Sequence, residues 1–135
     1  MIVDIFIPCF IDQFYPETAH NLIKILERLD IAVNYNPRQT CCGQMAFNSG
    51  FWDEARKVAS KFLNDFPEDR PIITPSASCA GFIKNYYHIL FHNSAQHNEY
   101  KQVKKNIYEF TDFLVNVLHV SDLGASFPHK VTYHS

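Results

Sequence analysis

Hydrophobic and polar residues in the first half of the chain follow strand and helix patterns in turn. Residues 2–7 form a β-branched and aromatic run that stops at Pro8, which predicts a buried strand. Pro16 can open a helix, because proline is tolerated in the first turn. Apolar residues then recur at helical spacing up to position 29, which predicts an amphipathic helix. Residues 31–35 predict a second short strand.

The second half of the chain continues this alternation. The spacing of apolar residues predicts a helix over 51–66, and residues 72–74 predict a third strand that a proline closes. A further helix is expected over 78–91. Apolar residues at helical intervals over 103–117 predict a long amphipathic helix, and residues 130–134 at the end of the chain predict a fourth strand.

Strands that alternate with helices of this length indicate right-handed βαβ units. The sequence therefore predicts an α/β fold, with an open, mainly parallel, Rossmann-like sheet of three to four strands flanked by helices. Hydrophobic residues make up 47% of the 135 residues, which is enough to bury the core of one domain without disulfides. The formal net charge of −2 provides no attraction to nucleic acid or to an anionic membrane, so neither is expected as a partner.

The apolar N-terminal run lacks the features of a targeting or membrane segment. It has no basic region and contains Asp4, so it is a poor signal peptide. No segment approaches the length needed to span a bilayer. We therefore expect a cytoplasmic protein. In a reducing cytosol, its four cysteines are expected to bind metal or act in catalysis rather than form disulfides.

The four cysteines follow the three predicted strands. Cys9 comes directly after the first strand, Cys41 and Cys42 lie in the loop after the second, and Cys79 lies just past the third. In an open parallel sheet, the loops at the carboxyl ends of the strands meet at one edge, where such folds bind ligands. The order of the strands therefore predicts a single site that contains all four sulfurs.

Four clustered thiolates need a cation or a cationic inorganic core to offset their charge. Structural zinc usually takes cysteine pairs with about two to four residues between them, whereas the adjacent Cys41 and Cys42 chelate one ion awkwardly. An adjacent pair binds two irons of one cluster more comfortably, so an iron–sulfur cluster is favoured over zinc. Two other interpretations remain open: a redox-active or disulfide-bonded Cys41–Cys42 pair, and a Cys9 that packs as a small hydrophobe.

Three segments of the chain resemble a known family. They are CFIDQFYPE from Cys9, TCCGQMAFNSG around Cys41 and Cys42, and TPSASCAG around Cys79. Together they resemble the first copy of the cysteine-rich CCG domain, and they are most similar to its lactate-utilization branch. The resemblance runs over essentially the whole chain. It implies that these four cysteines hold an iron–sulfur cluster, expected to be of the 4Fe–4S type, with zinc as the alternative occupant.

The resemblance also implies a function and partners. It implies a cytosolic iron–sulfur subunit that passes electrons during oxidation of L-lactate or a related 2-hydroxy acid, without being catalytic itself. Its implied partners are other iron–sulfur subunits of a lactate or glycolate oxidation complex. The alternatives are a structural or interaction module that holds zinc or no metal, and a thiol–disulfide oxidoreductase that uses Cys41 and Cys42.

The chain departs from the family pattern in two ways. The fuller pattern ends in C-x-x-C, but here Ser76 occupies the first of those positions, so four sulfur ligands remain. Family members also normally carry two such domains in tandem. We therefore expect residues 1–135 to be the single N-terminal CCG domain of a two-repeat protein, and residues 130–135 to be the first strand of the second repeat.

Overall fold

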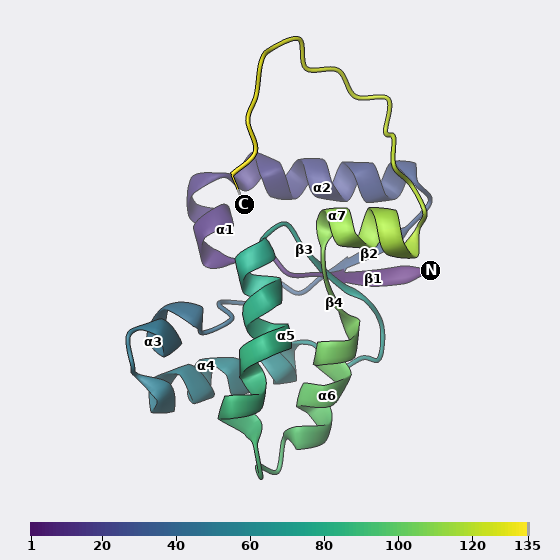
Figure 1. Cartoon of the computed structure of the whole chain (residues 1–135). Helices are drawn as coiled ribbons and strands as arrows, with labels where there is room; N and C mark the ends of the chain where they lie inside the picture. Colours follow the sequence, from purple (N-terminus) through teal and green to yellow (C-terminus); the bar gives the residue numbers. More distant parts are fainter. Residues whose placement is uncertain (135) are drawn as a thin grey trace.

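A four-stranded parallel sheet forms the centre of the molecule, as seen in a computed structural model that describes residues 1–134 (Figure 1). The strands are β1 (Ile2–Ile5), β2 (Ala32–Tyr35), β3 (Ile72–Thr74) and β4 (Ile107–Glu109), and their order in the sheet is β2-β1-β3-β4. Helices pack on both faces of the sheet. The predicted α/β class, with its open parallel sheet, is confirmed.

Strand β1 lies inside the sheet and pairs with both β2 and β3. Its register places Ile5 opposite Tyr35 on one side and opposite Ile73 on the other. β3 in turn pairs with β4 through Ile72 and Ile107. Because all three pairings are parallel, the carboxyl ends of the strands lie at one edge, where the loops that follow them meet.

One face of the sheet is covered by helix α2 (Pro16–Arg28) and by two short C-terminal helices, α7 (Phe110–Asp112) and η1 (Phe113–Val117). Leu22 and Leu26 stand one turn apart on α2 and pack against Val3 and Ile5 of β1. This is the apolar stripe that the sequence predicts, and it explains why α2 lies along this face.

The opposite face is covered by α4 (Trp52–Asp65), α5 (Ala77–Phe91) and α6 (His97–Asn106), as Figure 1 shows. Its core is rich in aromatic rings. Phe6 meets Phe62 of α4 edge to face at 4.8 Å between centroids, and Tyr87 of α5 packs against Phe62 and Phe91. Phe6 and Ile5 are neighbours in sequence and point to opposite cores, as expected where both faces of a strand region are buried.

The prediction of one long helix over residues 103–117 is wrong. Helix α6 ends at Asn106, the chain then forms the short strand β4, and it becomes helical again in α7 and η1. Ile107 is fully buried and pairs with Ile72, so the sheet satisfies backbone groups that a continuous helix would have satisfied internally. No glycine or proline stands where the helix gives way to the strand. The apolar residues of successive elements happen to fall at helical intervals, which is why the sequence predicts a single helix.

The C-terminal strand predicted over 130–134 is also not formed within this chain, where the fourth strand is β4. Residue 135, which the prediction included, lies outside the described residues. The assignment of 130–135 to the first strand of a second repeat stays a prediction. Two short helices that the sequence did not indicate, α1 (Cys9–Phe14) and α3 (Gln44–Asn48), follow the first two strands. Within residues 1–134, no helix has the length and apolar character required to cross a bilayer.

Candidate functional site

The four cysteines lie at the carboxyl edge of the sheet. Cys9 is the first residue of α1, Cys41 and Cys42 lie in the loop between β2 and α3, and Cys79 lies in the first turn of α5. The sulfur of Cys9 is 4.0 Å from that of Cys41, and the sulfur of Cys42 is 3.5 Å from that of Cys79. The structure therefore brings together sulfurs from three separate loops, as the strand order predicts. Their role as ligands stays a prediction.

The site is buried at one end and open at the other. Cys42 and Cys79 are 2% and 8% exposed, Cys41 is half-buried, and Cys9 is exposed. The vicinal pair therefore joins an inner sulfur pair, Cys42 with Cys79, to an outer pair, Cys9 with Cys41. This arrangement suits a group that is anchored in the interior and accessible from one side.

The loop that carries the vicinal pair is closed by Gly43. This glycine has a φ of 92°, in the left-handed region that residues with a Cβ rarely adopt. Its N–H donates to the sulfur of Cys41 at 3.4 Å. A Cβ at this position would lie 3.1 Å from the carbonyl oxygen of Ala55 on α4. Gly43 therefore permits both the turn and the close approach of the cysteine loop to α4.

The thiols differ in acidity. The pKa of Cys41 is lowered to about 5, chiefly because the Cys42 thiol donates a hydrogen bond to it, and the Gly43 N–H assists. The pKa of Cys79 is lowered to about 7 by a hydrogen bond from Cys42 and by the Ser76 hydroxyl, among other contacts. The pKa of Cys42 is raised by its contacts with the sulfurs of Cys41 and Cys79 and by burial, all of which favour the protonated thiol. Partial burial and the nearby Cys41 raise the pKa of Cys9.

Ser76, three residues before Cys79, caps helix α5. Its Oγ accepts a hydrogen bond from the Cys79 N–H at 3.3 Å and lies 3.2 Å from the Ser78 Oγ. Serine is a preferred residue for this capping role. Ser76 thus supports the helix turn that presents Cys79.

The donor set fits a soft metal centre better than a hard cation, because all four candidate ligands are sulfur and two of them ionise readily. The two sulfur separations are close to the edge of a thiolate tetrahedron around one zinc, about 3.8 Å. In residues 1–134, however, no three His, Cys, Asp or Glu side chains are arranged to hold a single ion. Four cysteine sulfurs at one edge of the sheet fit a thiolate-ligated metal group.

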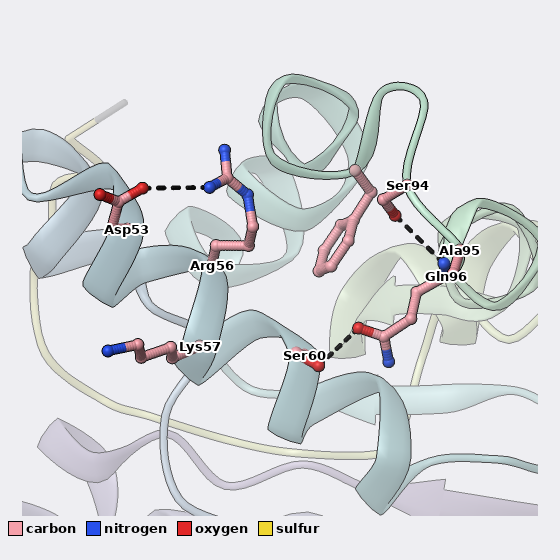
Figure 2. A pocket seen from close by; sticks show the side chains of 8 residues that line it. Asp53, Arg56, Lys57, Ser60, Ser94, Ala95 and Gln96 are labelled. Carbon is pink, nitrogen blue, oxygen red and sulfur yellow. Dashed lines mark hydrogen bonds and ion pairs between the residues drawn. The ribbon is translucent and has the colours of Figure 1, made fainter.

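A separate cavity of about 630 Å³ lies between α4 and the turn that joins α5 to α6 (Figure 2). Most of its polar side chains bond to one another or to the backbone. Arg56 donates to the Leu90 carbonyl at 3.0 Å and pairs with Asp53, while the Ser60 hydroxyl donates to Gln96 at 2.5 Å. The bonds of Arg56 to Leu90 and of Ser60 to Gln96 join α4 to α5 and to the turn before α6. None of the four cysteines lines the cavity.

The family model of the cysteine-rich domain, CCG, matches residues 3–84, a segment that contains all four cysteines. The chain belongs to the CCG family. The predicted family resemblance is thereby confirmed, although a search of solved structures finds none with significant similarity to this CCG chain.

Curated relatives of this CCG chain carry the name "Lactate utilization protein A". The chain is 40% identical to one from Geobacillus thermodenitrificans over all of its 135 residues, which cover 56% of that relative. It is 41% identical to one from Geobacillus kaustophilus, again over 56% of the relative, and 34% identical to one from Bacillus subtilis over 57%. The chain thus spans just over half the length of these relatives.

Sequence reasoning missed two residues at the site. The side chain of Gln39 hydrogen-bonds to the backbone on either side of the strand end before Cys9, and the Tyr87 hydroxyl donates to the Cys42 carbonyl at 2.6 Å. Neither residue belongs to a metal-ligand motif. Their contacts cross between loops, so no local spacing in the sequence could have indicated them.

Proposed function

We propose that this CCG domain holds an iron–sulfur cluster through Cys9, Cys41, Cys42 and Cys79 and passes electrons in lactate utilization. The observation that carries the proposal is the meeting of four thiols from three loops at one sheet edge, with sulfur separations of 4.0 and 3.5 Å. Four thiolates are the usual ligand set of such clusters. A cluster of the 4Fe–4S type is the form we favour.

In this function the protein would hold the cluster, orient it toward a partner and set its reduction potential. The bound cluster would supply one-electron transfer. The four cysteines would be its ligands, and the Gly43 N–H is placed to donate to the sulfur of Cys41. Hydrogen bonds to ligand sulfur and solvent exposure both set the reduction potential of such centres. The exposed Cys9 marks the side from which a partner would exchange electrons.

The substrate assignment depends on the relatives. Their printed name refers to lactate utilization, and we extend that role to this chain as an electron-transfer subunit in the cytosol. L-lactate or a related 2-hydroxy acid would be oxidised on another subunit. The partners would be other iron–sulfur subunits of a lactate or glycolate oxidation complex.

We also propose that residues 1–135 are the first of two CCG repeats. The relatives are nearly twice as long as the matched segment, which leaves room for a second domain of similar size. In that arrangement, residues 130–135 would enter the second repeat as its first strand.

A thiol–disulfide oxidoreductase is the second candidate, favoured by one observation. Cys41 adjoins the Cys42 thiol and accepts from the Gly43 N–H at 3.4 Å, and both contacts lower its pKa to about 5, as in nucleophilic thiols of redox-active cysteine pairs. A zinc-bound structural module is the third, favoured by sulfur separations close to a tetrahedral edge.

Metal and sulfide analysis of anaerobically prepared protein distinguishes these functions. We expect brown protein with iron and acid-labile sulfide in stoichiometric amounts. Colourless protein with one zinc per chain would support the structural module instead. Metal-free protein that reversibly loses two thiols on mild oxidation would support the oxidoreductase. Either result would overturn the iron–sulfur proposal.

A further inference from the structure

The side chain of Gln39 connects the loop that carries Cys9 to the loop that carries Cys41. Its Oε1 accepts from the Ile7 N–H at 2.7 Å, and its Nε2 donates to the Ile5 carbonyl at 2.9 Å. Nε2 also donates to the carbonyl of Asn36, in its own loop, at 2.9 Å. Ile7 precedes Cys9 by two residues, and Gln39 precedes Cys41 by two.

These bonds replace a missing part of the sheet. The β1–β2 ladder ends at the pair Ile5 and Tyr35, where the two chains begin to diverge. Ile7 is buried beyond that point, so its N–H needs a partner within the protein. The Gln39 amide accepts from one backbone group and donates to another, as a strand residue does. It therefore holds the outer cysteine loops together after the strands have separated.

Tyr87 makes the corresponding connection on the inner side. Its hydroxyl donates to the Cys42 carbonyl at 2.6 Å, and its side chain is fully buried. Tyr87 lies on α5, eight residues after Cys79, so the bond ties the vicinal loop to the helix that presents Cys79. Edge-to-face contacts with Phe82 and Phe62 hold the ring in place.

We propose that Gln39 and Tyr87 are positioning residues, each of which sets one of the two sulfur pairs. Gln39 sets the spacing of Cys9 and Cys41, and Tyr87 sets the spacing of Cys42 and Cys79. The proposal deepens the proposed function and rests on it for the role of these pairs in cluster binding. It also requires that a substitution of Gln39 alter only the outer pair and that a substitution of Tyr87 alter only the inner pair.

The first test uses metal-free protein, so that it does not depend on any cluster. Two backgrounds isolate the pairs: one lacks the inner pair through Cys42→Ser and Cys79→Ser, and the other lacks the outer pair through Cys9→Ser and Cys41→Ser. Diamide oxidises each remaining pair to a disulfide, and mass spectrometry of tryptic peptides measures its rate of formation.

We expect Gln39→Met to slow disulfide formation in the outer pair by about tenfold, because the loss of its hydrogen bonds to Ile7 and Ile5 lets the two loops move apart, and to leave the inner pair unchanged. Tyr87→Phe is expected to slow disulfide formation in the inner pair and to leave the outer pair unchanged. Gln39→Glu keeps an acceptor for the Ile7 N–H and should restore part of the rate. Equal slowing of both pairs by either variant, or no slowing in a folded variant, would overturn the proposal.

Two control variants remove the same chemical groups, an amide and a buried tyrosine hydroxyl, at positions away from the cysteines. Gln102→Met deletes an amide that donates to the Pro67 carbonyl, and Tyr100→Phe deletes the hydroxyl of a buried tyrosine on α6. Tyr100 stacks on Phe91 of α5. Phe91 lies twelve residues after Cys79, which places the two residues about 18 Å apart along the helix axis. Neither control should alter either pair. Should Tyr87→Phe not fold, 3-fluorotyrosine at position 87 keeps the ring, and its altered hydroxyl should change the inner rate alone.

The second test uses the full protein reconstituted anaerobically with iron and sulfide. Gln39→Met and Tyr87→Phe should each lower the affinity for iron by about tenfold and shift the electron paramagnetic resonance spectrum, while thermal unfolding matches that of the control variants. An unchanged spectrum and iron affinity in both variants would contradict a role for them in cluster binding. If the wild type takes up no iron, the proposed function fails, and the disulfide rates still decide whether the two residues position the pairs.

Discussion

The sulfur of Cys42 lies 3.5 Å from that of Cys79, although 37 residues separate them in the sequence. The connection between them contains α3, α4 and β3, and it returns the chain to the same edge of the sheet beside β1. The site is therefore a product of parallel topology. Any function of these thiols depends on the loops that hold them at that edge.

The first prediction concerns the vicinal pair. Cys42→Ser removes the thiol that donates to the sulfur of Cys79, and we expect it to lower the iron content of anaerobically prepared protein by at least about tenfold. Cys41→Ser should act similarly. Iron and sulfide analysis measures the effect. Circular dichroism should show nearly unchanged helix content, because the substitution changes one atom of a side chain and leaves the many aromatic and aliphatic contacts of the core in place. Full iron content in both variants would contradict the ligand assignment.

The second prediction separates Ser76 from the ligands. Ser76→Ala removes the helix cap whose Oγ accepts from the Cys79 N–H, so stability should fall by about 1 kcal/mol. Iron content should stay close to that of the wild type. Urea unfolding and iron analysis measure the two effects, with Ser78→Ala as the control that leaves the cap in place. A large loss of iron in Ser76→Ala alone would identify its oxygen as a ligand.

The third prediction concerns Gly43. Gly43→Ala forces a left-handed residue to carry a Cβ, at roughly 1–2 kcal/mol, and brings that Cβ to 3.1 Å from the Ala55 carbonyl oxygen. Gly50→Ala is the matched control, because Gly50 has a φ of 84° and open space around it. Urea unfolding should show a larger loss for Gly43→Ala, and only that variant should also lose iron. Equal losses would mean that the approach to Ala55 is unimportant.

The fourth prediction concerns pH and uses metal-free, reduced protein. The lowered pKa of Cys41, about 5, means that its reactive thiolate persists as pH falls from 8 to about 6 and is lost only near pH 5. The raised pKa of Cys42 keeps that thiol protonated over this range. Alkylation with iodoacetamide, followed by peptide mass spectrometry, should label Cys41 at a nearly constant rate between pH 6 and 8 and label Cys42 last. An alkylation rate for Cys41 that rises about tenfold per pH unit over that range would contradict the shift.

Much of this architecture was predictable because local patterns agreed with the sheet. The run that ends at Pro8 and the apolar stripe around Leu22 and Leu26 identify β1 and α2 directly. Each cysteine follows a predicted strand, and parallel strands end at one edge. Strand order alone therefore predicted that Cys9 and Cys79 would approach the vicinal pair.

Other features depended on contacts between distant segments. Ile107 continues a helical repeat in the sequence, yet it forms β4 because pairing with Ile72 satisfies its backbone groups and buries its side chain. The sequence likewise contains no sign that the sulfurs form an inner and an outer pair. That division follows from where each loop leaves the sheet.

By itself, the sequence determined the fold class, the family and the edge at which four sulfurs gather. The alternation of strands and helices, and the position of each cysteine after a strand, are local properties of the chain. Only the tertiary structure decided the position of the fourth strand, the pairing of the thiols and the involvement of Gln39 and Tyr87. These depend on hydrogen bonds between side chains and backbone groups far apart in the sequence, and such partners become definite only when the loops have packed.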